Sequence, residues 1–439
     1  MKKVLSTVVA LGCCLYLPSA VLAGGGKKVS DDMSREMSDL RAQLAKQQAE
    51  IDMLKGQKSD PTLASRLDAL EKKKGYVMAG NAFIDGVTLT GSLRERFQMN
   101  SYNFYNSADA DQERFRTIAR LGGVWQNKAE NWSIGAGLAT GLATGNRGAE
   151  DTWGERAAFE HADINLDYMY AKHTFGDYAV LLGQTPYPYK ASWIFMDGDL
   201  RPTGATVAYG QATGVFAMAG AYGAQVLDID TASSRDDNTG MVYIGQVGYA
   251  DKFSEKGKYT LALGYHMVDQ AYMNEIARDL TLSSTSTALD DYSVEVGNLY
   301  GDVSFPVGPV ALTLYGQVWM NFAADAADGV SQANIGTENP DENDMGWSLG
   351  LSGTMDQVHF AYSYSVLEAD SQWGGYTDSA AAVQSFTNVQ GHKANIGYDV
   401  TKNWALDFTY YNFENIVDVS TATAMEDTQT YQFDVSYKF

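Results

Sequence analysis

The strongest constraint on the fold is a two-residue alternation of apolar and polar side chains that recurs through most of the chain. It is clearest at the C-terminus, where apolar residues occupy every second position and the chain ends on phenylalanine. These residues are Tyr431, Phe433, Val435, Tyr437 and Phe439. The same period appears in residues 357–366 and 404–410. Because successive side chains of a strand point to opposite faces, the pattern predicts strands with one apolar and one polar face.

The lengths of the connections distinguish a closed barrel from a soluble sandwich, which alternates in the same way. Sixteen strands are expected at residues 88–101, 113–126, 131–140, 165–175, 178–187, 203–210, 213–224, 240–251, 257–268, 293–305, 309–321, 344–355, 357–368, 390–400, 403–415 and 427–439. The links between them are alternately short, as at 176–177, and long, as at 141–164 and 269–292. Short turns at one end, long loops at the other and an even number of strands are typical of outer-membrane barrels.

An open sheet edge in lipid would leave backbone groups unpaired, so strands in a membrane must close into a barrel. The sequence therefore predicts an all-β transmembrane antiparallel β-barrel of about 16 strands (range 14–18) over residues 76–439. A barrel of that size keeps a water-filled lumen rather than a packed core.

The composition excludes several other classes of protein. The formal net charge is −22, whereas a protein that binds nucleic acid through its phosphates carries a basic surface. The two cysteines, Cys13 and Cys14, are too few for a disulfide-rich scaffold. No run of about 20 apolar residues follows the first two dozen positions, so no membrane-spanning helix is expected. A hydrophobic content of 45% is too high for a disordered chain.

Residues 1–23 have the features of a secretory signal peptide. A short basic start precedes an apolar core, Pro18 interrupts that core, and small or compact residues lead to Ala23. The alternative is a lipoprotein anchor at Cys13, but Ala10 stands where a lipobox has a larger apolar residue. We therefore expect export, with a mature chain that begins at residue 24.

Residues 24–75 are predicted to form a short α-helical coiled coil in the periplasm. Apolar residues recur there at steps of four and three, which is the spacing of a heptad repeat. They are Met33, Met37, Leu40, Leu44, Ile51 and Leu54. A single amphipathic helix lying on another core is the alternative. Because no such core is encoded nearby, self-association is the favoured interpretation.

Several stretches in the first third of the predicted barrel carry a family resemblance. They are residues 91–96 (GSLRER), 114–122 (RFRTIARLG), 131–141 (NWSIGAGLATG), 168–183 and 193–204 (WIFMDGDLRPTG). These stretches resemble the putative porin family of Gram-negative outer membranes, whose members often carry a coiled coil before the barrel. The resemblance implies a passive diffusion channel for small hydrophilic solutes or ions, and a homotrimer would fit such a protein.

Five arginines fall on the first two predicted strands. They are Arg94, Arg96, Arg114, Arg116 and Arg120. Within each strand they are an even number of residues apart, so they share one face. A charge on the lipid face costs about 2–4 kcal/mol near the midplane, so both sets are expected to point into the lumen as a basic wall. The alternative is that they form salt bridges with neighbouring strands and only fill space.

Carboxylates opposite this wall would complete a transverse field that screens solutes by charge and dipole, with weak charge selectivity. The candidates are Asp163, Asp167, Asp197 and Asp199. The first two are expected on a face opposite Leu166, Tyr168 and Tyr170. The other two belong to the link at 188–202, and the sequence does not decide whether this link enters the lumen. Glu95 falls on the outward face of its strand and is expected near the rim.

No cofactor and no catalytic site are predicted. The five histidines are scattered, and no HExxH, GxSxG or Walker motif occurs. The acidic surplus lies mainly in predicted loops, where solvation or weak attraction of cations accounts for it, and no segment has EF-hand spacing. Three alternatives remain open: a substrate-specific anion or oligosaccharide channel, a hydrolase whose site assembles from separate strands, and a plugged barrel that tethers the membrane to peptidoglycan.

The expected location is the Gram-negative outer membrane, with the coiled coil in the periplasm. The partners expected there are membrane lipid and lipopolysaccharide, with peptidoglycan contact through the coiled coil and no nucleic acid. The alternating residues of the last strand are interpreted as the C-terminal signal for the barrel-assembly machinery.

Overall fold

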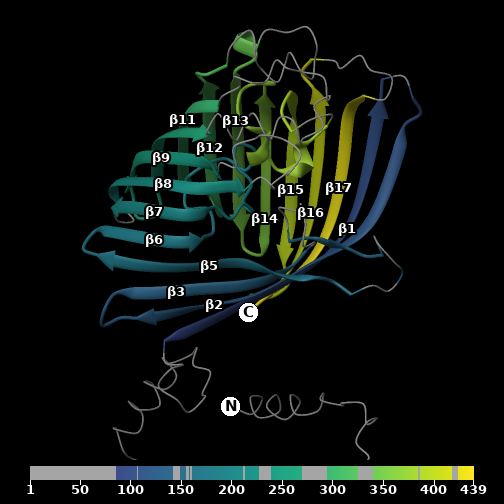
Figure 1. Ribbon diagram of the computed structural model, residues 1–439. Helices are drawn as coiled ribbons and strands as arrows, with labels where there is room; N and C mark the ends of the chain where they lie inside the picture. The colour runs from purple at the N-terminus through teal and green to yellow at the C-terminus, as the bar shows by residue number, and fades with distance from the viewer. Residues whose placement is uncertain are drawn as a thin grey trace, which may run out of the picture. The chain divides into compact units, whose positions relative to one another are not determined.

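Alternating strands pair in chain order into one antiparallel sheet that closes on itself, because β1 pairs with both β2 and β17 (Figure 1). The computed structural model describes residues 86–105, 107–141, 149–154, 158, 161–210, 213–226, 239–268, 294–324, 340–383, 386–417 and 424–439. The predicted signal peptide and coiled coil, with Met33, Met37, Leu40, Leu44, Ile51 and Leu54, lie outside these residues. No helix in the described part of the chain is long and apolar enough to cross a bilayer.

In the residues that the structure describes, sixteen strands make the wall, and a seventeenth, β4, contributes only two residues to it. The strands are β1 (Val87–Phe104), β2 (Ala110–Asn127), β3 (Trp132–Thr140), β4 (Asp151–Thr152), β5 (Ile164–Phe175), β6 (Tyr178–Gln184), β7 (Thr203–Gly210), β8 (Gly214–Val226), β9 (Thr239–Lys252), β10 (Lys258–Val268), β11 (Val294–Val307), β12 (Val310–Asn321), β13 (Met345–Met355), β14 (Val358–Leu367), β15 (Val389–Asp399), β16 (Trp404–Asn415) and β17 (Met425–Lys438).

The predicted barrel of about 16 antiparallel strands is confirmed, and two of the differences from the predicted strands bear on the lumen. The fifth predicted strand, β6, ends at Gln184 rather than at residue 187, and the chain leaves the wall after the Thr185 amide donates to the Pro202 carbonyl (3.0 Å). The sequence did not predict β4. It pairs with Arg116 and Thr117 of β2, beyond the point where β3 has ended.

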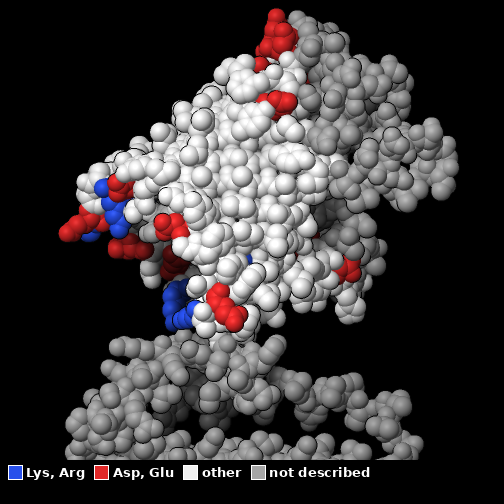
Figure 2. Space-filling view, turned by 60° about the vertical axis from the view of Figure 1, so that its left-hand side comes forward, with Lys and Arg blue, Asp and Glu red and all other residues white. Residues whose placement is uncertain are grey.

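Side chains alternate between the lumen and the outer face, as the two-residue period requires. In β17, Phe433 and Val435 are 47% and 43% exposed on the outer face, whereas Gln432 and Asp434 are buried inside. The outer face accordingly shows a broad continuous area of uncharged residues, with charged residues at its margins (Figure 2). A surface of this kind suits contact with lipid, where a charge near the midplane is costly.

Two connections fold into the lumen and pack against the wall formed by β9 to β16. In residues 185–202, the Ser192 amide donates to Gln317 Oε1 of β12 (2.6 Å), and Trp193 Nε1 donates to Ser363 Oγ of β14 (3.0 Å). In residues 368–383 and 386–388, which contain the 3-10 turns η5 (Gly374–Tyr376) and η6 (Ser379–Ala381), the Tyr376 carbonyl accepts from the Asp197 amide of the first connection (2.8 Å).

The two inserted connections bury an apolar core inside the barrel. Ile194 and Phe195 are at most 1% exposed, and the Phe195 ring packs edge-on against Trp319 of β12, with 5.1 Å between ring centroids. Wall residues of the same cluster, such as Val296 and Phe413, complete the packing. The remaining open space therefore lies toward the opposite wall, where β1, β2 and β17 carry polar side chains.

A bulge in β5 changes the direction of side chains that the sequence placed on the outer face. The register with β3 shifts between Gly137 and Leu138, so Asp167 has no direct partner between Leu166 and Tyr168. Asp167 and Tyr168 therefore both point inward, and the expectation that Tyr168 and Tyr170 lie opposite Asp167 is wrong. The two tyrosine rings lie over glycines of β3, where a Cβ atom would collide with them.

Replacing Gly137 with alanine is expected to destabilise the barrel by about 1–3 kcal/mol, because the added Cβ must displace the Tyr168 ring. The measurement is the temperature at which the folded band disappears in heat-modifiability gels. Gly245→Ala is the matched control, since the nearest atom to a Cβ there is the Met218 carbonyl oxygen at 4.0 Å. Equal transition temperatures for the two variants would contradict the packing argument.

Candidate functional site

The arginines of β1 and β2 form one continuous basic face inside the barrel, which we call the arginine wall. The antiparallel register sets Arg96 beside Arg116 and Gln98 beside Arg114, and paired residues point to the same side of a sheet. Arg120 lies opposite Ser92, closer to the end of the barrel that holds the C-terminus. Arg94, Arg96, Arg114 and Arg116 line a cavity of about 730 Å³, whereas Arg120 is outside its lining.

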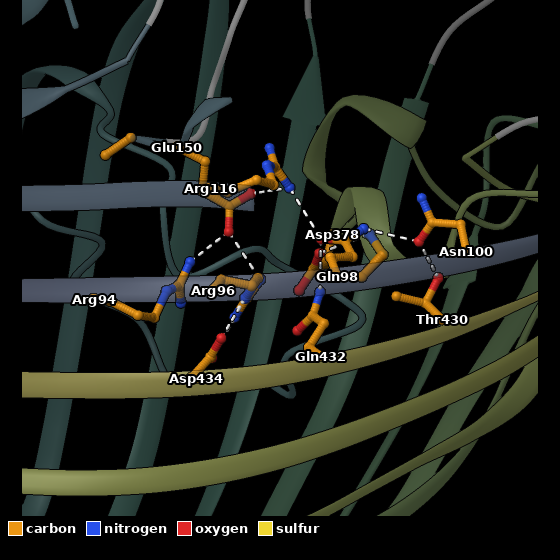
Figure 3. A network of polar contacts seen from close by, with 12 residues as sticks. Arg94, Arg96, Gln98, Asn100, Arg116, Glu150, Asp378, Thr430, Gln432 and Asp434 are labelled. Carbon is orange, nitrogen blue, oxygen red and sulfur yellow. Dashed lines mark hydrogen bonds and ion pairs between the residues drawn. The ribbon is translucent and has the colours of Figure 1, made fainter. Parts of the chain in front are cut away.

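Glu150 is the acidic centre of the arginine wall, and the sequence did not single it out. Its carboxylate accepts from Arg96 Nη1 (2.8 Å) and also forms ion pairs with Arg94 and Arg116 (Figure 3). The residue directly precedes β4, which extends the wall beside β2 and points this side chain inward. Glu150 lies in a long link with no periodic pattern, so only the pairing of β4 could reveal its position.

Asp434 of β17 holds Arg96 from the other side. Arg96 Nε and Nη2 donate to its two carboxylate oxygens, both at 2.7 Å, in a bidentate pair. Asp434 occupies a polar position in the alternation of the last strand, so the sequence carried a signal for an inward carboxylate there. Beyond it a ladder of neutral side chains continues along β1 and β17 (Figure 3): Gln98, Asn100, Thr430 and Gln432.

A second charged group surrounds Arg120. Arg120 Nη2 contacts Asp199 (2.7 Å) and its Nε lies 3.7 Å from Asp167, which also accepts from Arg201 Nε (2.9 Å). Two arginines thus face two carboxylates, and the β5 bulge supplies one of them. Asp163 ends the link before β5 and is not among the described residues that line the cavity.

The inserted connections and β15 supply the charges across the cavity from the arginine wall. Asp197, Asp199 and Asp378 line it from the connections, and Lys393 lines it from β15. The Lys393 ammonium lies 3.9 Å from the centre of the Trp193 ring, a cation–π contact that ties this wall to the inserted segment. The arrangement therefore lines the cavity with arginines from β1 and β2 and with carboxylates from the inserted connections, and Asp199 also contacts Arg120 of the arginine wall.

A family model described as "Putative porin" matches residues 65–294, which is more than half of the chain. The chain belongs to this porin family. No curated protein matches the sequence. The porin family and the barrel fold together indicate a channel of the outer membrane.

Solved structures are similar to this chain at low sequence identity, and the first of them shares its fold. The high-pH structure of Pseudomonas putida OprB is 11% identical, with a TM-score of 0.51 over 85% of this porin and 96% of that chain. OccK8 (OprE) of Pseudomonas aeruginosa is 12% identical, with a TM-score of 0.46 over 82% and 99% of the two chains. The channel DcaP of Acinetobacter baumannii is 11% identical, with a TM-score of 0.44 over 81% and 98%.

Proposed function

We propose that this porin is a passive diffusion channel for small hydrophilic solutes and ions, with weak charge selectivity. The observation that carries the proposal is the cavity of about 730 Å³ between the arginine wall and the inserted connections. Its lining is mostly charged or hydrogen-bonding, although the barrel also contains an apolar core. Polar linings of this kind replace part of the hydration of a solute and allow it to leave again.

The selectivity is proposed to come from the charge separation across the cavity. Arg94, Arg96, Arg114 and Arg116 line the cavity from the barrel wall, and Asp197 and Asp199 line it from the first inserted connection. In a narrow aqueous passage such a field favours solutes whose dipoles align with it. Arg120 and Asp167 support the field indirectly, because Arg120 pairs with Asp199 and Asp167 pairs with Arg201.

Purified protein reconstituted into a planar bilayer is expected to give stepwise ionic current in potassium chloride. The current is expected because ions pass through the open lumen, and the size of each step measures the conductance of that passage. A barrel that tethers the membrane and is plugged by its inserted connections would give no steps above the bare bilayer. That result would overturn the channel proposal.

The remaining assignments are proposals of the same kind. The heptad residues from Met33 to Leu54 would associate three barrels into a homotrimer from the periplasm. The outer-face residues of β17, the strand that closes the barrel by pairing with β1, would present the C-terminal signal to the assembly machinery. The family and the fold point to a channel rather than to an enzyme.

A further inference from the structure

The three arginines around Glu150 have the composition of a receptor for a carboxylate. Arg94 and Arg96 reach it from β1 and Arg116 reaches it from β2, so donors from two strands meet on one anion (Figure 3). Guanidinium groups match the planar geometry of a carboxylate and bind it with charge-assisted hydrogen bonds. In this structure the anion at their centre is a side chain of the same protein.

The backbone that carries Glu150 is fixed on both sides, and its side chain points into the lumen toward the arginines. Thr140 Oγ1 donates to the Ala149 carbonyl (2.9 Å), and Thr152 of β4 pairs with Arg116 of β2. The side chain carboxylate is therefore held near the arginines by a short tether. A tethered group competes with a free one at an effective concentration in roughly the millimolar range.

The arginines outnumber the carboxylates on their own side of the cavity, whereas Asp197, Asp199, Asp378 and Asp407 line its other sides. Four arginines and two carboxylates meet on this part of the wall: Arg94, Arg96, Arg114, Arg116, Glu150 and Asp434. Among the described residues Arg114 makes no ion pair, and the Nε atoms of Arg94, Arg114 and Arg116 are buried without a hydrogen-bond partner. All six side chains line the open cavity, so a solute that enters it lies beside the arginines.

We propose that Arg94, Arg96 and Arg116 bind a carboxylate group of a permeating solute, and that Glu150 is a tethered occupant which this carboxylate displaces. The inference rests on the proposed channel function and names its substrate class as small carboxylic acids. Exchange with a resident carboxylate keeps the site from holding the solute for long. A channel needs such weak binding, because a solute that binds tightly blocks the passage.

The test is the concentration of succinate that blocks half of the chloride current in a planar bilayer. Glu150→Gln removes the competing charge but keeps the size of the side chain, so the half-blocking concentration is expected to fall about tenfold. The matched control is Glu95→Gln, which makes the same change on β1 between Arg94 and Arg96. Glu95 faces outward and accepts from Thr117 Oγ1 (2.7 Å), so its replacement is expected to leave the half-blocking concentration unchanged.

The same measurement with sulfate in place of succinate distinguishes a carboxylate site from a general attraction of anions. An equal gain in block by sulfate, an equal effect of Glu95→Gln, or no effect of Glu150→Gln would overturn the proposal. If Glu150→Gln fails to assemble, Glu150→Asp tests the proposal instead. Its carboxylate is one methylene further from the arginines and competes less well, so the half-blocking concentration must also fall severalfold. Absence of current in the wild-type protein would instead refute the channel function, and it is recorded before any succinate is added.

Discussion

Replacing Arg94 and Arg114 together with glutamine is expected to shift the permeability ratio of the channel toward cations by about threefold to fivefold. Both side chains line the cavity, and a unit charge about 4 Å from a passing ion contributes roughly 1 kcal/mol in water, which salt then screens. Arg96 and Arg116 are kept so that Asp434 and Glu150 each retain an arginine partner when Arg94 is replaced. The measurement is the reversal potential under a salt gradient.

The control for this prediction makes the same change in formal charge outside the lumen. Lys256 and Lys402 lie exposed in the turns between β9 and β10 and between β15 and β16. Their joint replacement with glutamine is expected to leave the reversal potential near its wild-type value. A reversal potential that is the same for the arginine variant and the wild type would remove the proposed selectivity of the arginine wall. Neutralising all five arginines of β1 and β2 should shift the ratio further in the same direction.

Replacing Phe195 with alanine is expected to release the first inserted connection from the barrel wall and to widen the passage. Its ring is 1% exposed and packs edge-on against His266 and Trp319, with centroids at 5.0 and 5.1 Å. Truncating a buried phenylalanine costs about 3–5 kcal/mol, whereas the paired strands keep their backbone hydrogen bonds. Single-channel conductance should rise and become noisier, and larger polyethylene glycols should enter the channel.

Phe322→Ala is the matched substitution for this experiment, because Phe322 is 65% exposed at the end of β12. It should leave both the conductance and the size limit for polyethylene glycols unchanged. The same conductance and size limit in the Phe195 variant as in the wild type would show that the connection does not restrict the passage. Heat-modifiability gels on each variant establish that the barrel has assembled before current is recorded.

The candidate site was predictable where it depends on a single strand. The even spacing of Arg94 and Arg96, and of Arg114 and Arg116, places each pair on one face, and the cost of charge in lipid selects the inner one. The position of Glu95 shows the limit of this argument. The outward direction of its side chain follows from the spacing. However, Glu95 lies in the middle of β1 and not near the rim, and Thr117 of β2 supplies its polar partner there.

Contacts between distant segments were not predictable in the same way. Glu150 meets the arginines only because β4 pairs with β2 beyond the end of β3, and a two-residue strand has no readable period. Asp167 and Tyr168 point to one side because β5 has a bulge, which breaks the alternation that the sequence argument assumes. The insertion of residues 185–202 depends on Gln317 and Ser363, which lie more than a hundred residues away in the chain.

The residue pattern of the chain is enough to predict the closed antiparallel wall, the approximate ends of its strands, its apolar outer face and the inward direction of the arginines. These properties follow from the two-residue period of a strand and from the high free-energy cost of charge and unpaired backbone groups in lipid. The location of the passage and the carboxylates that meet the arginines become known from the folded barrel alone. Those features arise where loops without apolar–polar alternation contact barrel residues that are distant in the chain. These residues are in position only once the barrel has closed.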